Sequence, residues 1–347
     1  MARLTPDSVN PENRSSPFFD NTAMLAKVLY RIRSHSALFA RALCNGASLK
    51  RLLITRAPFW FADSRYPPSM HVELTNACNL QCVYCNNPHF AHPRGVMDDR
   101  TLDGLIEGLR GSRVDRLCIG GGEPTLHPKF AEFVKRLRPE VRVLTIVTNG
   151  HWTRKGTAEA MVSAPIDFIE VSVEAGTAQD FEAMRVGANY AKFLANLREL
   201  RSLRDRTGSS SLINLRMMVR PSQQGRIERE SHKYWSAFAD SVMPQYVLKD
   251  DEIATIEDAF TPRSGTPGQY PKCTLPFRNL QVRWNGDVPI CQISGSTLIP
   301  AKKVVTGNVK DHLVQDLWNG NMFKTYRHAH RTRDEAAMPI CKGCKGC

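Results

Sequence analysis

Cysteines are the residues of this sequence best suited to chemistry, because they are clustered rather than scattered. Three of the 10 cysteines lie within eight residues and three more fall in the last seven positions: Cys78, Cys82, Cys85, Cys341, Cys344 and Cys347. Thiols at such spacings converge on one ion or cluster, so the pattern favours metal chelation over disulfides. Three thiolates can bind three irons of a cubane, which leaves the fourth iron open to another ligand.

Alternating strand and helix patterns surround these cysteines from about residue 68. Six short apolar segments predict strands: Met70–Leu74, Arg116–Ile119, Val143–Thr148, Phe168–Val173, Leu212–Val219 and Pro244–Leu248. Five segments between them have helical periodicity: Asp99–Leu109, Phe130–Leu137, Ala158–Val162, Tyr190–Leu203 and Ile227–Phe238. This alternation indicates a parallel sheet, and six units are too few for a closed eight-stranded barrel. The predicted fold class is α/β, a partial (β/α)6 TIM-type barrel with its chemistry on loops after the strands.

The segment after the first predicted strand resembles the hallmark motif of radical S-adenosylmethionine (SAM) enzymes. Its cysteines are separated by three and then two residues, and an aromatic residue precedes the last cysteine. Further motifs follow the next predicted strands in the order of that family, beginning with Gly-Gly-Glu-Pro and Thr-Asn-Gly. The resemblance implies a set of SAM-binding residues: Tyr84, Gly121, Gly122, Glu123, Asn149, Ser172, Glu174, Arg185 and Met218.

The same resemblance implies a mechanism. Cys78, Cys82 and Cys85 would hold a [4Fe–4S] cluster, and SAM would chelate its open iron. Glycines allow close backbone approach, and the Glu123 carboxylate can pair with the SAM ammonium group. Reduction of the cluster then cleaves SAM to a 5′-deoxyadenosyl radical, which removes a hydrogen atom from the substrate.

A second set of cysteines lies near the end of the chain. Cys273 and Cys291 flank a predicted hairpin, whose turn is an Asn-Gly pair, and Cys341 and Cys344 form a terminal CxxC. Together they would make a closed four-thiolate site. The arrangement resembles the SPASM and twitch extensions of radical SAM enzymes, which implies one auxiliary [4Fe–4S] cluster. A structural zinc site is the alternative.

Composition divides the chain into five expected parts. They are a flexible tail (1–20), a basic helical extension (21–67), the partial barrel (68–250), a linker (251–270) and a small β-hairpin/helix auxiliary-cluster domain (271–347). The net charge is +13, and residues 21–62 contain no Asp or Glu. We expect the basic helices to pack on the barrel, with contact to an anionic membrane surface as the less favoured alternative. Reduced thiols and the lack of an apolar export signal predict a cytoplasmic protein.

The fate of the substrate radical decides the reaction. A thiol that returns a hydrogen atom to the opposite face gives epimerisation, and Cys44, Cys118 and Cys347 are the candidates for it. A base that removes a proton leads to dehydrogenation, and Asp250 and Asp251 are candidates on the expected rim of the barrel. We expect a carbohydrate-like or other secondary-metabolite substrate and an acidic electron donor of the flavodoxin or ferredoxin type.

Two alternatives to that function remain open. One is a radical SAM enzyme that matures a peptide. The other is a nucleic-acid-binding metalloprotein, which is suggested by the excess of Lys and Arg over Asp and Glu. SAM and iron–sulfur clusters explain the motifs without nucleic acid, so we expect no nucleic-acid partner.

Overall fold

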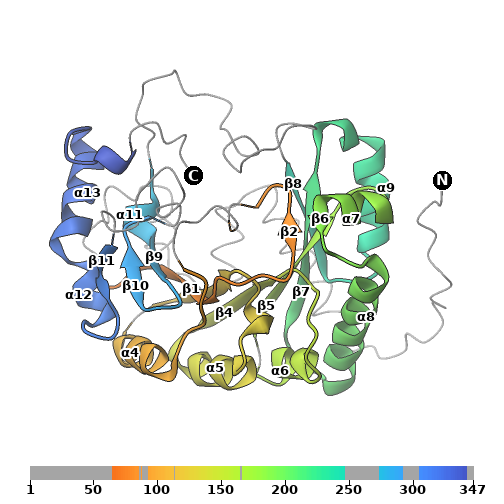
Figure 1. Cartoon of the computed structure of the whole chain (residues 1–347), viewed down its shortest axis with the longest axis horizontal. Helices are drawn as coiled ribbons and strands as arrows, with labels where there is room; N and C mark the ends of the chain where they lie inside the picture. The colour runs from red at the N-terminus through yellow and green to blue at the C-terminus, as the bar shows by residue number, and fades with distance from the viewer. Residues whose placement is uncertain are drawn as a thin grey trace.

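A seven-stranded parallel sheet forms the centre of the computed structural model, which describes residues 65–85, 87, 93–112, 114–164, 166–246, 273–291 and 305–341 (Figure 1). The strand order is β8-β7-β5-β4-β3-β1-β9. The predicted tail, the predicted linker and nearly all of the predicted basic extension lie outside these residues. The parallel α/β partial barrel expected from the sequence is confirmed.

The elements follow the predicted alternation closely. The strands of the sheet are β1 (Ser69–Thr75), β3 (Arg116–Gly121), β4 (Val143–Thr148), β5 (Phe168–Glu174), β7 (Leu212–Val219), β8 (Ser241–Tyr246) and β9 (Asn279–Val282). The helices between them are α4 (Asp99–Leu109), α5 (Phe130–Leu137), α6 (Thr157–Ser163), α7 (Ala178–Met184), α8 (Tyr190–Thr207) and α9 (Arg226–Trp235). Two antiparallel pairs lie outside the sheet: β2 (Gln81–Cys82) with β6 (Arg185–Val186), and β10 (Asp287–Pro289) with β11 (Val305–Asn308). Three further helices are α11 (Leu275–Arg278), α12 (Val314–Trp318) and α13 (Asn321–Thr332).

The two faces of the sheet differ in chemistry. One face is apolar and packs against the helices, of which α4, α5 and α6 lie side by side along the sheet (Figure 1). The opposite face, here called the polar face, carries the alternate residues of the same strands, and many of them are polar: His71, Glu73, Cys118, Thr145, Glu170, Ser172, Glu174, Asn214, Arg216 and Gln281. The apolar residues Val143, Val147, Phe168, Leu212 and Met218 share that face. Parallel strands covered on both sides are usually apolar on both faces. The polar face is therefore built for something other than core packing.

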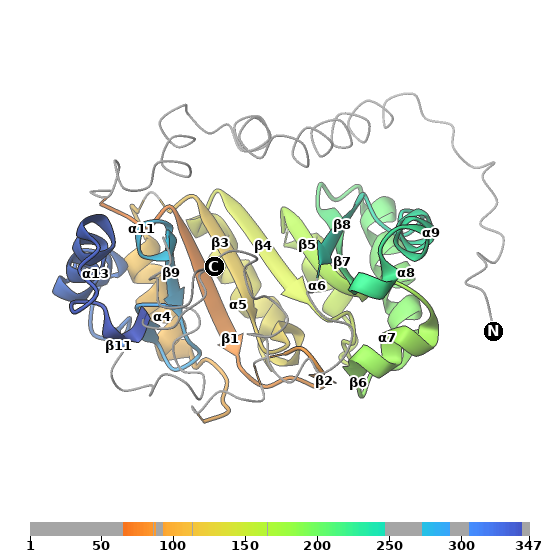
Figure 2. The same ribbon diagram turned by 90° about the horizontal axis from the view of Figure 1, so that it is seen from above.

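The edge strand β9 is the main departure from the predicted topology. It pairs in parallel with β1, so the sheet gains a seventh strand from a segment more than 200 residues later. The predicted Asn-Gly turn is present, with Gly286 at φ +89° and its N–H bonded to the Arg283 carbonyl at 2.9 Å. The strands on either side of that turn pair with different partners, because β9 joins β1 and β10 joins β11. Figure 2 shows β9 beside β1 from above.

The basic stretch near the end of the chain forms helix α13. Arg327 is buried there, its guanidinium 3.9 Å from the centre of the Trp318 ring. It also donates hydrogen bonds of 2.8 Å to the carbonyl groups of Pro276 and Trp318. The charged side chain of Arg327 therefore packs inside the protein and joins α13 to α11 and α12.

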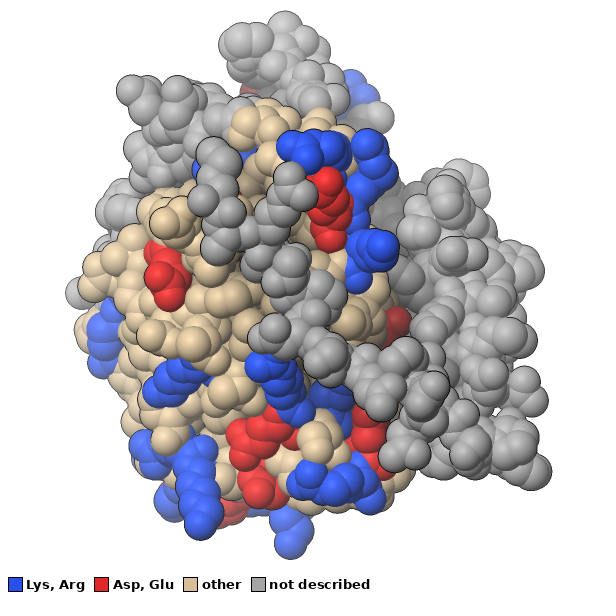
Figure 3. All heavy atoms as spheres, turned by 90° about the vertical axis from the view of Figure 1, so that its right-hand side faces the viewer, with Lys and Arg blue, Asp and Glu red and all other residues tan. Residues whose placement is uncertain are grey.

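Charges of both signs share the outer surface. The part drawn in colour in Figure 3 shows carboxylates lying between the lysines and arginines. On α8, Arg201 pairs with Asp205, and on α9, Arg226 pairs with Glu230. None of the helices within the described ranges is both long enough and apolar enough to cross a membrane.

Candidate active site

The three cysteines predicted to hold the first cluster lie on one loop, between the end of β1 and residue 85. Backbone N–H groups already point at two of their sulfurs: Leu80 donates to Cys78 Sγ at 3.5 Å and Asn87 to Cys85 Sγ at 3.4 Å. In the part of the chain that the structure describes, no three His, Cys, Asp or Glu side chains gather around a single ion. A cubane does not need such a gathering, because each thiolate binds a different iron.

A short ladder fixes the middle cysteine of that loop. In the β2–β6 pair, Cys82 lies directly opposite Arg185. Burial raises the pKa of Cys82 to about 11, against a lowering effect of Arg185. Binding of iron must therefore release the proton of this thiol. The two-residue strands gave no pattern in the sequence, so this link between the cysteine loop and Arg185 was not predicted.

Arg185 is held in a buried polar cluster with two other predicted SAM-binding residues. Its Nε lies 2.9 Å from Glu174 Oε1, and both side chains are almost completely buried. The hydroxyl group of Tyr84 donates to the same carboxylate oxygen. Burial raises the pKa of Glu174, and the Arg185 guanidinium offsets part of that rise. The structure thus brings Tyr84, Glu174 and Arg185 together, and their roles toward SAM stay predictions.

Glu123 joins the ends of two strands. Glu123 is 1% exposed, and burial raises its pKa, although its carboxylate accepts four hydrogen bonds that offset part of that rise. Thr125 donates from its backbone N–H and its hydroxyl at 3.2 and 2.6 Å, and Thr148 donates from its hydroxyl at 2.8 Å. The backbone N–H of Asn149 donates to the second carboxylate oxygen, Oε2, at 2.7 Å. Oε2 is the oxygen with room for a further donor, which suits the predicted contact with the SAM ammonium group.

The two glycines before Glu123 let the cysteine loop approach this strand end. A Cβ atom on Gly122 would lie 2.0 Å from the carbonyl oxygen of Ala77, so only glycine fits there. Gly121 has φ +106°, and a Cβ on it would meet the side chain of Glu73 at 2.5 Å. The sequence predicted close backbone approach at these glycines. The structure shows the cysteine loop itself as one partner in that approach.

Asn149 connects the end of β4 to the cysteine loop. Its side-chain nitrogen, Nδ2, donates to Asn79 Oδ1 at 2.9 Å and points to Cys78 Sγ at 3.6 Å. Asn79 in turn donates to the backbone carbonyl of His151 at 2.8 Å. Asn149 therefore lies beside a predicted iron ligand, where it can hold the thiolate in place.

Ser172, Met218 and Cys118 occupy the polar face of the sheet. Met218 lies opposite Glu174 across the β5–β7 ladder, and Ser172 lies opposite Arg216. Cys118 lies opposite His71, and burial raises the pKa of its thiol to about 12. All three predicted residues thus face the same side as Glu174, whereas the neighbours of Met218 on β7 face the helices.

One of the cysteines predicted for the auxiliary site lies beside helix α13. Burial raises the pKa of Tyr326 on that helix to about 12, and charges on Cys341 and Cys291 add to the rise. His330 Nε2 lies 3.8 Å from Cys341 Sγ. Cys273 is buried. Cys341 and the His330 imidazole thus lie in contact, which the sequence did not suggest, and the roles of Cys273, Cys291 and Cys341 as cluster ligands stay predictions.

Several predicted site residues lie outside the described ranges: Cys44, Asp250, Asp251, Cys344 and Cys347. Other polar-face residues were not predicted at all. Glu73 is 3% exposed, and burial raises its pKa, although the N–H of Trp284 donates to its carboxylate at 3.4 Å. Alternation of Met70, Val72 and Leu74 with polar residues in the first strand was the signal that could have identified His71 and Glu73.

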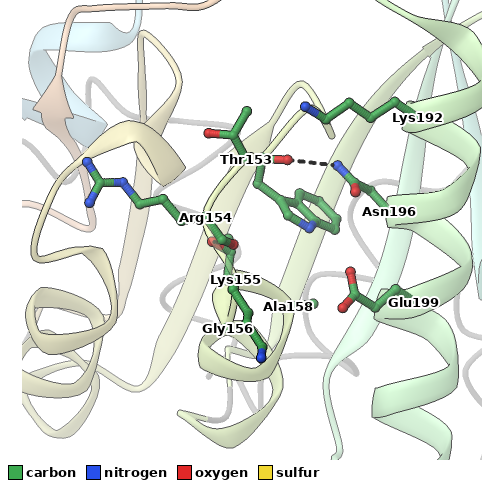
Figure 4. Close-up of a pocket in the computed structure, with 10 residues that line it drawn as sticks. Thr153, Arg154, Lys155, Gly156, Ala158, Lys192, Asn196 and Glu199 are labelled. Atoms are coloured by element: carbon green, nitrogen blue, oxygen red, sulfur yellow. Dashed lines mark hydrogen bonds between the residues drawn. The ribbon is translucent and has the colours of Figure 1, made fainter.

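A pocket of about 260 Å³ lies between the loop after β4 and helix α8. Arg154 and Lys155 of the loop and Lys192 and Glu199 of the helix line it, and in Figure 4 the Arg154 side chain extends away from the helix. The loop begins at Asn149, next to the cysteine loop. The pocket is therefore lined by three basic side chains and one carboxylate, beside a loop whose first residue contacts the cysteine loop.

Two family models match this chain. The radical SAM superfamily model matches residues 72–218, and an iron–sulfur cluster-binding domain model, SPASM, matches residues 273–345. The first range contains the cysteine loop, Glu123, Asn149 and Glu174, and the second contains Cys273, Cys291, Cys341 and Cys344. The matched ranges therefore include both predicted cluster sites.

Similar proteins extend this picture. The mycofactocin maturase MftC of Mycobacterium ulcerans is 30% identical over 128 residues, which are 37% of this chain and 35% of that protein. The chain thus spans about a third of the length of that relative. A tungsten-containing aldehyde ferredoxin oxidoreductase cofactor-modifying protein of Pyrococcus furiosus is 23% identical over 79% of this chain and 86% of its own length.

A solved structure supports the fold. The structure of native anSMEcpe with bound AdoMet superposes with a TM-score of 0.54 at 17% identity, over 79% of this chain and 88% of that chain. The two family models account for the cofactors, which are SAM, a [4Fe–4S] cluster and auxiliary iron–sulfur binding. The chain belongs to the radical SAM superfamily and carries a C-terminal SPASM iron–sulfur domain.

Proposed function

We propose that this enzyme abstracts a hydrogen atom from a C–H bond of a small carbohydrate-like or secondary-metabolite substrate, and that it epimerises or dehydrogenates that substrate. When bound, SAM and the reduced cluster supply the 5′-deoxyadenosyl radical that starts such reactions. Glu123 and Asn149 hold the cysteine loop, while Tyr84, Glu174 and Arg185 form a polar wall beside it. One auxiliary [4Fe–4S] cluster, held by Cys273, Cys291, Cys341 and Cys344, completes the proposed cofactor set.

The observation that favours epimerisation is the position and protonation of Cys118. Its thiol lies on the polar face, and burial raises its pKa to about 12, so it keeps its hydrogen at neutral pH. A hydrogen-atom donor must carry that S–H bond. Donation to the opposite face of a substrate radical inverts the carbon and leaves a thiyl radical. One electron from the proposed flavodoxin- or ferredoxin-type donor and one proton from solvent then restore the thiol.

The basic pocket beside α8 supports an acidic electron donor. Arg154, Lys155 and Lys192 surround it, and its loop starts at Asn149, next to Cys78. An acidic protein docked there would contact the loop that begins beside Cys78, and opposite charges would favour its binding. High salt should then slow reduction by flavodoxin more than reduction by dithionite.

Peptide maturation is the second candidate, and the names of similar proteins favour it. MftC is called a maturase, and a solved structure of SuiB from Streptococcus suis contains a precursor peptide. A peptide side chain could enter the same face of the sheet as a small molecule. The polar face alone does not separate these two substrate classes, so the assay must include both.

The test uses the full chain, reconstituted anaerobically with iron and sulfide. Reduction with dithionite in the presence of SAM should give 5′-deoxyadenosine, and Cys78→Ala should abolish it. About eight irons per chain are expected for two cubanes, and no more than about four in the wild type would contradict the auxiliary cluster. If Cys78→Ala still formed 5′-deoxyadenosine, the assignment of the cysteine loop would be wrong.

Deuterated water distinguishes the outcomes for the substrate. Retention of one solvent deuterium at an inverted carbon indicates epimerisation, and a mass loss of two hydrogens indicates dehydrogenation. Cys118→Ala should remove the deuterium-labelled epimer. Absence of either change with every sugar or cyclitol tested, together with a change in a candidate peptide, would favour maturation instead.

A further inference from the structure

A row of side chains crosses the polar face of the sheet at mid-height. His71 on β1 lies between Gln281 of β9 and Cys118 of β3 in the two parallel ladders. The imidazole leans toward β3, because a Cβ placed on Gly120 would lie 2.5 Å from His71 Nε2. Neighbouring strands are about 5 Å apart, so the three side chains form a continuous patch.

Two atoms of this patch are buried without a hydrogen-bond partner. They are His71 Nδ1 and Gln281 Oε1, on residues that face each other across the β1–β9 ladder. The Gln281 side chain is only 9% exposed. Most buried polar atoms in proteins are paired, so two orphaned atoms on adjacent residues point to a missing ligand group.

The charge of the patch limits what that group can be. Burial lowers the pKa of His71 to about 4, so its imidazole is neutral at physiological pH. Further along the same face, Glu170 is neutralised by an ion pair with Arg216, and Arg116 lies two residues before Cys118. The imidazole and the amide oxygen themselves offer no countercharge to an anion. A hydroxyl group fits, because it can donate to Gln281 Oε1 and also bond to the imidazole nitrogen.

We propose that His71 and Gln281 form the recognition end of the substrate site and bind a hydroxyl group of a neutral substrate. This inference rests on the proposed function, since it assumes that the substrate occupies the polar face. A hydroxyl group held there places the adjoining carbon atoms beside Cys118, the next residue of the row. His71 and Gln281 are then positioning residues that set substrate specificity.

Stability provides a test that needs no substrate. Gln281→Leu and His71→Phe remove orphaned polar atoms, so the midpoint of thermal unfolding at pH 7 should stay unchanged or rise by about 2 °C. Asn214→Leu is the matched control, because this buried amide on the same face accepts a hydrogen bond of 2.6 Å from Ser241. The control should lower the midpoint, since it leaves the Ser241 hydroxyl without that acceptor. A decrease in Gln281→Leu as large as that in Asn214→Leu would overturn the inference.

Binding provides the second test. Saturation-transfer NMR on the reconstituted chain with SAM would use myo-inositol and methyl α-glucoside as neutral probes and gluconate as an anionic one. The neutral probes should bind the wild type, and Gln281→Leu or His71→Phe should weaken binding about fivefold to tenfold. No binding of either neutral probe to the wild type, or stronger binding of gluconate, would refute the hydroxyl assignment.

Failure of this inference can be told apart from failure of the proposed function. The wild-type samples are also assayed for 5′-deoxyadenosine after reduction. Its absence would count against the proposed function. Its presence, together with polyol binding that is the same in Gln281→Leu and the wild type, would overturn only the role of His71 and Gln281.

Discussion

Removal of the Glu123 carboxylate should destabilise the apo protein strongly, whether or not any cofactor binds. The carboxylate is 1% exposed and accepts from two backbone N–H groups, of Thr125 and Asn149, and from two threonine hydroxyls. In Glu123→Ala the two threonine hydroxyl groups can rotate toward new acceptors. The backbone N–H groups of Thr125 and Asn149 are fixed and stay unpaired. Each buried donor left unpaired costs about 1–3 kcal/mol, so we expect a loss of about 3–5 kcal/mol in the free energy of unfolding.

Urea unfolding of the full, reduced chain measures this loss. Glu123→Gln should lose about 1–3 kcal/mol, because an amide keeps one oxygen acceptor but turns an NH₂ group toward the second site. Glu132→Ala, on the exposed side of α5, is the control and should change stability by less than about 0.5 kcal/mol. Amide hydrogen exchange at Asn149 should accelerate in Glu123→Ala. A change below about 1 kcal/mol, or unchanged exchange at Asn149, would refute the idea that Glu123 joins β3 to β4.

Three further predictions follow from particular contacts. Gly122→Ala should displace the cysteine loop, because its Cβ would lie 2.0 Å from the Ala77 carbonyl oxygen; iron analysis should show about four irons lost per chain. Arg327→Met should lower the free energy of unfolding by about 2–4 kcal/mol in urea titrations, since two buried carbonyl groups lose their donor and Trp318 loses its stacked cation. The depressed pKa of His71 means that the unfolded chain binds more protons between about pH 6.5 and pH 4, so stability falls as the pH falls through that range. His71→Phe should remove about 2–3 kcal/mol of that fall, measured by urea unfolding at pH 7 and pH 4.5.

Local patterns identified most of the barrel from the sequence. Strands β3, β4, β5 and β7 begin at their predicted residues, because each is a run of apolar residues between turn signals. Helices α4 and α5 match their predicted bounds, since their apolar residues recur at helical spacing. The cysteine loop and the Glu123 and Asn149 motifs were found because their chemistry depends on spacing along the chain.

Features that depend on distant pairing were not predicted. Strand β9 reads as half of a local hairpin, and only contact with β1 makes it part of the barrel sheet. The β2–β6 ladder is two residues long on each side, too short for any periodic signal, yet it sets Arg185 opposite Cys82. Helix α7 was missed although Thr177 and Asp180 form a capping box, a signal that was present in the sequence.

Helix α13 shows a different limit. Its run of Arg and His residues indicates only a charged stretch, because charge patterns do not show which charges are buried. Arg327 is nevertheless stacked on Trp318 and bonded to two carbonyl groups. Pairing of that kind becomes visible only when α11 and α12 are brought beside α13.

The helix-covered face of the sheet stabilises the fold, and the polar face carries the residues proposed to act on the substrate. The depth and chemistry of the polar face therefore bear on which substrate fits. Residues of the helix-covered face, such as Val72, Ile119 and Val171, are fully buried and hold the fold. On the polar face, Cys118 lies three residues before Gly121, about 10 Å below the end of the strand that supports the cysteine loop. A small ring or a single peptide side chain could span that depth, so length does not separate the two. The row of His71 and Gln281 favours the ring, because a sugar or cyclitol carries a hydroxyl on nearly every carbon, whereas few peptide side chains carry one.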